Sequence, residues 1–188
     1  MKIFLVSTPK GGEKLGDMFQ KLYHEVEVLG YTHTSKLIVS NPLEFEKKMK
    51  SDANANKSFY TEMRDAIQLA DICIFEASTP SFGVGYLIQE SLIHSKPTIV
   101  LFYKEPHSHL LTGVEDEKLI VEKYDEKNYA QVLRKALDHA REKRDKRFNF
   151  FLSPKLLQYI DDASKERSVT KSKLLRDMIV KHMRETAS

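Results

Sequence analysis

The sequence is poor in the features that mark secreted and membrane proteins. Its 188 residues include one cysteine, Cys73, so no internal disulfide can form, and the apolar run around this residue predicts a small core side chain. No stretch approaches the roughly 18 to 20 consecutive apolar residues that a membrane-spanning helix needs. No small-residue cleavage site follows the N-terminal "MKIFLVSTPK". We therefore expect a soluble, cytoplasmic protein with no membrane partner.

Metal-binding patterns are equally scarce. His107 and His109 form the triplet "HSH", but no further ligand spacing accompanies them. We expect a polar surface turn there rather than a metal site. Nothing else in the sequence calls for a metal or a cofactor.

The charge is distributed unevenly along the chain. Hydrophobic residues make up 41% of it and the formal net charge is +3, so the chain can build a core and is not expected to be disordered. Residues 141–188 contain 13 Lys and Arg against 7 Asp and Glu, a net charge of +6, which leaves −3 for residues 1–140. The basic tail suggests a polyanionic partner, and a solvated lysine-rich surface is the alternative.

Strand and helix patterns alternate over the first 140 residues. Helical spacing covers about 15–30, 59–69 and 83–95, and "SDANANK" reads as a turn or mobile loop. Extended apolar runs occupy 2–8, 32–39, 70–77, 97–103 and 118–124. This alternation predicts an α/β fold, a Rossmann-like or flavodoxin-like parallel sheet with helices on both faces. In such open sheets, ligands bind beyond the carboxyl ends of the strands.

Two loops fall at that edge, "STPKGG" after the first strand and "STPSFGVG" after the third. Glycines let a backbone approach a ligand closely, and free amides at a helix start attract negative charge, so both loops are suited to a phosphate. An ordinary turn is the alternative. The residues that we predict to bind the nucleotide or its phosphate are Ser7, Thr8, Lys10, Gly11, Gly12, Ser81, Gly83, Val84 and Gly85.

The stretches "FLVSTPKGG" and "ADICIFEASTPSFGVGY" together resemble the nucleoside 2-deoxyribosyltransferase superfamily, most closely its 2′-deoxynucleoside 5′-phosphate N-hydrolase branch. The resemblance covers residues 1–125. It implies that a carboxylate attacks the anomeric carbon of a deoxyribosyl group and displaces the base, while a serine and the first loop hold the 5′-phosphate. Lys10 stands where the family often has arginine. The motif positions retained here are Glu76, Pro80, Ser81, Gly83, Val84, Gly85 and Tyr86.

The sequence departs from the family pattern at the residues that the resemblance implies for catalysis. The resemblance implies a nucleophilic glutamate directly after Gly-Tyr, where this chain has Leu87, and an aspartate where it has Met63. Leucine has no lone pair with which to attack. Glu90 lies almost one helical turn further, roughly 4.5 Å along the axis. It is either a displaced nucleophile or an exposed helix carboxylate.

The basic tail has its own pattern. A charged amphipathic helix over 126–145 leads into a short alternating strand and two helices, which start after Ser153 and Thr170. A lone strand has no partner for its edges, so this segment has to pair with something.

The tail resembles the ribbon-helix-helix DNA-binding family over about residues 145–185. That family pairs the strands of two chains into a ribbon that enters the major groove. The resemblance implies a homodimer through the C-terminal ribbon, with DNA contacts from Arg147, Asn149, Phe151, Thr170, Lys171 and Ser172. Phenylalanine can make few specific contacts with base edges. The alternative is therefore kept that the ribbon serves only to dimerise the chain.

Taken together, these patterns predict three parts: a nucleotide-pocket domain over 1–125, a connecting helix over 126–145 and a ribbon-helix-helix domain over 146–188. The main hypothesis is a DNA-binding transcriptional regulator whose sensor domain binds a nucleoside monophosphate-like molecule and has lost catalysis. The first alternative is an active nucleotide N-glycosidase or deoxyribosyltransferase that uses Glu90 and dimerises by its tail. The second is a dimeric binding or scaffold protein with neither reaction nor operator.

Overall fold

The structure is a computed structural model that describes residues 1–8, 12–35, 53–105, 111, 113–144 and 150–186. It divides into two compact units, Met1–Asp145 and Lys146–Ser188, and each is described by itself. In the described part of the chain, no helix combines the length and the apolar character needed to cross a bilayer.

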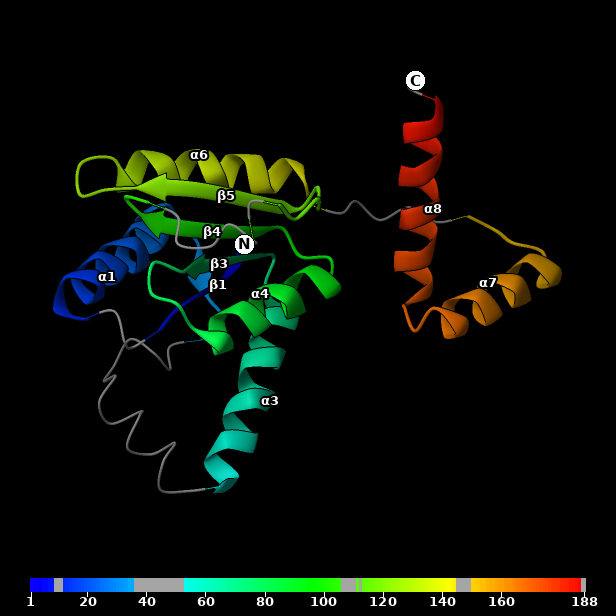
Figure 1. The fold of residues 1–188 in the computed structure, drawn as a ribbon, viewed down its shortest axis with the longest axis horizontal. Helices are drawn as coiled ribbons and strands as arrows, with labels where there is room; N and C mark the ends of the chain where they lie inside the picture. The colour runs from blue at the N-terminus through cyan, green and yellow to red at the C-terminus, as the bar shows by residue number, and fades with distance from the viewer. Residues whose placement is uncertain (9–11, 36–52, 106–110, 112, 145–149, 187–188) are drawn as a thin grey trace. The chain divides into compact units, whose positions relative to one another are not determined.

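The first unit is built on one parallel sheet (Figure 1). Its strands lie in the order β2-β1-β3-β4-β5, and every neighbouring pair is parallel. Apolar side chains fill the central strands on both faces, as a sheet covered by helices on both sides requires. The prediction of an α/β parallel sheet is confirmed. The strands are β1 (Lys2–Ser7), β2 (Thr32–His33), β3 (Ile72–Glu76), β4 (Thr98–Tyr103) and β5 (Leu119–Tyr124).

Within the described residues of this unit, four helices cover the sheet, two on each face. α1 (Gly12–Val28) and α6 (Tyr129–Glu142) pack against one face, in a core cluster that contains Ile3 and Leu5 of β1. α3 (Ala53–Leu69) and α4 (Phe82–Ile93) pack against the other, in a cluster that contains Phe4 and Val6. The alternation of side chains along β1 therefore divides the core between the two faces. Cys73 is fully buried in the second cluster, as its apolar surroundings predict.

Three elements differ from the prediction. The strand expected over 32–39 is shorter, since β2 ends at His33 and the next two residues are not in a strand; 36–39 lie outside the described residues. The expected loop "SDANANK" is helical from Ala53 onward, because Ala55 turns inward and is only 6% exposed, so packing outweighs the turn preference of the neighbouring asparagines. The expected connecting helix is α6, which buries Leu133 and Leu137 against the sheet. The first unit therefore extends beyond residue 125 to Asp145.

The second unit contains α7 (Pro154–Glu166) and α8 (Lys171–Thr186). α7 begins directly after Ser153 with proline at its first position, and α8 begins directly after Thr170, as the sequence predicts. The predicted ribbon strand lies largely outside the described residues, and 150–153 form no regular element.

Candidate functional site

The two predicted loops start side by side. β1 and β3 pair in register along their length, and Ser7 at the end of β1 lies opposite Glu76 at the end of β3. Thr8, directly after β1, is largely buried at 9% exposure. Gly12 opens α1 with a φ of +72°, a conformation that favours glycine. Lys10 and Gly11 lie outside the described residues.

The start of α4 is shaped for an anion. Ser81 caps the helix in an extended conformation, and its hydroxyl accepts a hydrogen bond from the Val84 amide at 3.4 Å. The first N–H groups of a helix have no carbonyl within the helix to bond, and the helix dipole adds positive potential there. A side chain added at Gly85 would meet nothing within 4 Å, so the backbone is open on that side. These features are the ones expected of a phosphate-binding helix start.

A buried carboxylate ties the ends of three strands together. Glu76 is 2% exposed, and its Oε1 accepts hydrogen bonds from the Tyr124 hydroxyl of β5 at 3.2 Å and from the Ser78 amide at 3.3 Å. The Ser78 hydroxyl also donates to Glu76 and accepts from the Tyr103 amide of β4 at 2.6 Å. Burial, reinforced by the Glu76 charge, raises the pKa of Tyr124. Glu76 therefore links the carboxyl ends of β3, β4 and β5 through buried hydrogen bonds.

The positions where the family resemblance places carboxylates are apolar and buried. Leu87 of α4 is 9% exposed and Met63 of α3 is 1% exposed, and both belong to the core cluster beneath these two helices. Neither can supply a nucleophile or a proton acceptor.

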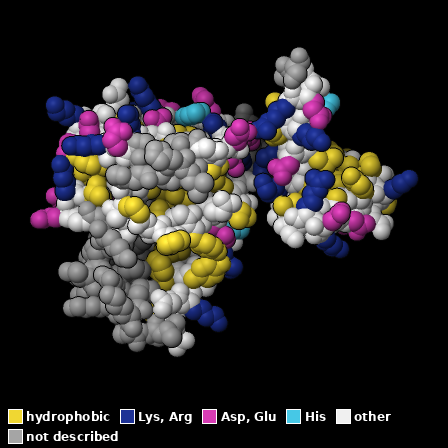
Figure 2. All heavy atoms as spheres, viewed as in Figure 1, with side chains coloured by type: hydrophobic (Ala, Val, Ile, Leu, Met, Phe, Trp, Pro, Cys, Tyr) yellow, Lys and Arg dark blue, Asp and Glu magenta, His cyan; other side chains and the backbone are white. Residues whose placement is uncertain are grey.

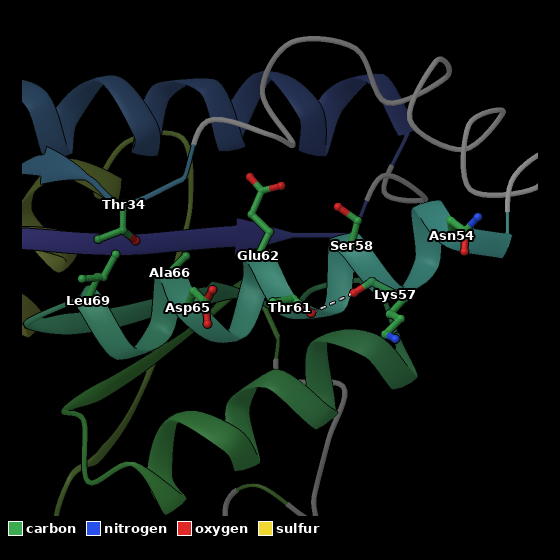
Figure 3. A pocket seen from close by; sticks show the side chains of 9 residues that line it. All are labelled: Thr34, Asn54, Lys57, Ser58, Thr61, Glu62, Asp65, Ala66 and Leu69. Atoms are coloured by element: carbon green, nitrogen blue, oxygen red, sulfur yellow. Dashed lines mark hydrogen bonds between the residues drawn. The ribbon is translucent and has the colours of Figure 1, made fainter.

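Other carboxylates lie on the same two helices. Glu90 is three residues beyond Leu87 on α4, and its side chain is 14% exposed. Its Oε1 lies 3.2 Å from Nε2 of His94, one turn further along the helix. Glu62 and Asp65 of α3 line a cavity of about 610 Å³. Figure 3 shows that Glu62 projects from α3 away from α4.

A second cavity, of about 780 Å³, lies along α4. Its walls include Val84 and Ile88 of α4 and Phe102 of β4, and the hydroxyl-bearing Thr79 and Ser81 also line it. It therefore combines apolar walls with the capped start of the helix.

Tyr60 of α3 and Tyr86 of α4 form an exposed pair. Their hydroxyl oxygens lie 3.3 Å apart and their ring centroids 6.2 Å apart. The hydrogen bond from Tyr60, with lesser contributions from desolvation and from Glu90, raises the pKa of Tyr86 to about 12. Figure 2 shows hydrophobic side chains gathered where α3 and α4 lie side by side. The contact between the two tyrosines could not be foreseen from the sequence, because the residues are 26 positions apart and no local pattern joins them.

The remaining predicted site residues are distributed as follows. Among the residues that the structure describes, no three His, Cys, Asp or Glu side chains gather as a metal site would require. His107 and His109 lie outside that set, as do Arg147 and Asn149. The other four residues predicted to contact DNA are described: Phe151 and Ser172 are exposed, the Thr170 hydroxyl accepts from the Lys173 amide at 3.2 Å, and Lys171 pairs with Asp161.

Three curated proteins are similar in sequence to this chain, and all carry the provisional name 2′-deoxynucleoside 5′-phosphate N-hydrolase 1. The Thermofilum pendens protein is 30% identical over 105 residues, which are 56% of this chain and 70% of that protein. The Methanosarcina mazei protein is 28% identical over 66% of this chain and 76% of its own length. The Nematostella vectensis protein is 22% identical over 70% of this chain and 90% of its own length. No family model matches the chain.

Two solved structures are similar at a lower level. One is the CMP N-glycosidase BcmB of Clostridium botulinum, 18% identical with a TM-score of 0.48 over 73% of this chain and 99% of that one. The other is an NADH:FMN oxidoreductase, EMOB, which is 16% identical with a TM-score of 0.44 over 78% of this chain and 91% of that one. Likeness of this size does not distinguish one activity from another.

These relatives correct the main functional hypothesis. All three curated proteins are named as hydrolases, which points to an enzyme and overturns the prediction of a DNA-binding transcriptional regulator. They also give no support to a ribbon-helix-helix domain in residues 146–188. The Thermofilum pendens protein is matched at 30% identity over more than two thirds of its length, and this chain belongs to the 2′-deoxynucleoside 5′-phosphate N-hydrolase family.

Proposed function

We propose that the chain is a nucleotide N-glycosidase, which hydrolyses the bond between base and sugar in a nucleoside 5′-phosphate. The observation that carries the proposal is the start of α4, where the stretch "PSFGVGY" of the family resemblance forms a serine-capped helix end at the carboxyl edge of β3. The names of the relatives supply the reaction class and the deoxyribosyl substrate.

The phosphate is assigned to the start of α4. Ser81 contributes a hydroxyl, and the amides of the first turn contribute donors that the helix itself does not use. Ser7 and Thr8 at the end of the neighbouring β1 add two hydroxyls at the same edge. A dianion held this way fixes the nucleotide by one end, so the sugar is presented to α4 in one orientation.

The nucleophile is assigned to Glu90. Leu87 cannot attack, and Glu90 is the carboxylate that follows it on a neighbouring position of the same helix surface. Its partial burial and its contact with His94 restrict its side-chain conformations. In the proposed reaction, a Glu90 carboxylate oxygen forms a bond to the anomeric carbon while the bond to the base breaks, and the base takes a proton from water. A second water then hydrolyses the glycosyl ester and returns the free carboxylate.

Base release from a panel of deoxynucleoside 5′-monophosphates, followed by liquid chromatography, tests the proposal. We expect the wild type to release free base and sugar phosphate, and Glu90→Gln to lower the rate by at least a hundredfold. Glu62→Gln on α3 is the matched control, because it removes a carboxylate of the same kind from an exposed position, and it should keep the wild-type rate. No release by the wild type from any nucleotide of the panel would overturn the proposal. Equal rates in Glu90→Gln and the wild type would overturn the assignment of Glu90.

A further inference from the structure

The cavity of about 780 Å³ along α4 has the size and the lining of a small-molecule site. Most of its walls are apolar, and the polar side chains among its described lining residues are, besides Tyr86, those of Thr79, Ser81 and Gln89. Within the part of the chain that the structure describes, the side chains of Thr79 and Gln89 form no hydrogen bond or ion pair with another residue. These two polar groups are therefore available to a ligand.

One line of the α4 surface runs along the cavity. Ser81, Gly85 and Gln89 follow one another at intervals of four residues, and all three line the cavity. The distance from Ser81 to Gln89 along the helix axis is about 12 Å, which is close to the length of an extended nucleoside monophosphate. Gly85 lies between them without a side chain, and a Cβ added there would meet nothing within 4 Å. Glycine stabilises a helix less than alanine does, so folding does not explain this open position.

Aromatic rings form another part of the wall. Phe82 and Tyr86 lie one turn apart on α4 and both line the cavity. Phe82 is fully exposed and Tyr86 is half-exposed, so their ring faces are accessible. The Tyr86 hydroxyl lies 3.3 Å from that of Tyr60, which restrains the orientation of the Tyr86 ring. Nucleobases stack on accessible aromatic rings of this kind.

We propose that this cavity binds the base of the nucleotide, stacked on Tyr86 with Gln89 hydrogen-bonded to its edge, and that it favours adenine. The inference rests on the proposed function, because it takes the phosphate to lie at the start of α4. A glutamine amide presents one donor and one acceptor side by side, which match N7 and the N6 amino group of adenine. Guanine, cytosine and thymine each carry a carbonyl oxygen, which apolar walls would leave without a donor.

The test is calorimetric titration of the full chain with carbocyclic analogues of the four deoxynucleoside 5′-monophosphates. In these analogues a methylene group replaces the ring oxygen of the sugar, so the bond to the base is not hydrolysed during the measurement. 2-Deoxyribose 5-phosphate, which has no base, is the fifth ligand. We expect the adenine analogue to bind about tenfold or more tightly than the sugar phosphate and than each of the other three analogues.

Three substitutions in the cavity separate the parts of this site. Gln89→Leu removes the amide at similar volume and should erase the preference for adenine. Tyr86→Ala should weaken all four analogues by about tenfold and leave the sugar phosphate unaffected. Gly85→Leu should fill the open position and weaken every analogue by about tenfold or more. Gln68→Leu on α3 and Gly16→Leu on α1 are matched controls, because they make the same changes at exposed positions outside the cavity, and both should bind as the wild type does.

Two results would overturn the inference. One is a Gln89→Leu protein with the affinities and the order of bases of the wild type; since Gln89 is exposed, its replacement should not disturb the fold. The other is a Gly85→Leu protein that binds the analogues as tightly as the wild type, which would place the base outside the cavity. If base release from natural nucleotides persists alongside either result, the proposed function stands and only this inference is lost. Tight binding of the adenine analogue with no base release from any nucleotide would overturn the proposed function and keep the assignment of the cavity.

Discussion

Met63 of α3 and Leu87 of α4 lie in one buried core cluster, at the two positions where the family resemblance implies carboxylates. A lone charge at either position would be buried among apolar side chains, which is costly.

Restoring the first carboxylate should increase base release. We expect Leu87→Glu to raise the rate by tenfold or more and to restore activity to a Glu90→Gln background, because it places a nucleophile at the position where the family resemblance implies one. A charge buried in this apolar cluster should also lower the free energy of unfolding by about 1–3 kcal/mol, and Met63→Asp tests whether a second carboxylate adds to the rate. The measurement is initial rate by chromatography together with chemical unfolding.

The control for this prediction is Leu87→Gln. It has the same shape and polarity as the glutamate but no nucleophilic oxygen, so its rate should stay at the wild-type level. Faster release in Leu87→Gln would mean that polarity at this position, rather than covalent attack, limits the reaction.

Ser81 should determine affinity for the phosphate. Ser81→Ala removes a charge-assisted hydrogen bond and should weaken binding of a nucleoside monophosphate by about 1.5–3 kcal/mol, with little effect on the unphosphorylated nucleoside. It also removes a helix cap, at a cost of about 0.5–2 kcal/mol in stability. Calorimetric titration with the nucleotide and with its nucleoside measures the difference.

Ser81→Asp separates the two effects. Aspartate caps a helix as well as serine does, so the melting temperature should remain near that of the wild type, whereas its negative charge should abolish phosphate binding. Retained nucleotide affinity in Ser81→Asp would place the phosphate away from the start of α4.

Glu76 and Tyr124 should be energetically coupled. Each of Glu76→Gln and Tyr124→Phe should lower the free energy of unfolding by about 1–3 kcal/mol, because the first weakens and the second removes a hydrogen bond to a buried, charged acceptor. The double variant should lose less than the sum of the two, with a coupling of about 0.5–3 kcal/mol. Urea unfolding of the four proteins in a double-mutant cycle provides the test, and strict additivity would contradict a direct interaction.

Glu126 should give a stabilising contribution that acid removes. The hydrogen bond from the Tyr103 hydroxyl, supported by Lys14 at 3.0 Å, lowers the pKa of Glu126 from 4.5 to about 2. Since the folded value lies below the unfolded one, the contribution is complete above about pH 5 and is lost as the pH falls toward 2. The difference in melting temperature between the wild type and Glu126→Gln should shrink over this interval, and a constant difference down to pH 2 would contradict the lowered pKa.

The sheet could be predicted because its central strands are continuous apolar runs, and parallel strands buried on both faces leave that pattern in the sequence. The start of α4 was also within reach, since Ser81 and the glycines after it are local signals. The start of α3 was not, because Asn54 and Asn56 resemble turn residues and only the packing of Ala55 reveals the helix.

The long-range parts of the site could not be predicted. The Glu76–Tyr124 hydrogen bond joins positions 48 residues apart, and nothing in either local segment specifies the other. Met63 and Leu87 attract notice only because the family resemblance implies carboxylates at these two positions. In the tail, periodicity located α7 and α8 but carried no information on what they bind, and the inference of DNA binding rested on a family resemblance and on the net charge of +6.

The burial of Cys73 has a practical consequence for studying the chain. Desolvation raises the pKa of this thiol to about 12, so it is protonated and shielded at neutral pH. A cysteine introduced on the outer surface of α7 would therefore be the one thiol open to alkylation in the folded protein. A spin label attached there would occupy a single site in each chain, with no native thiol to be removed first.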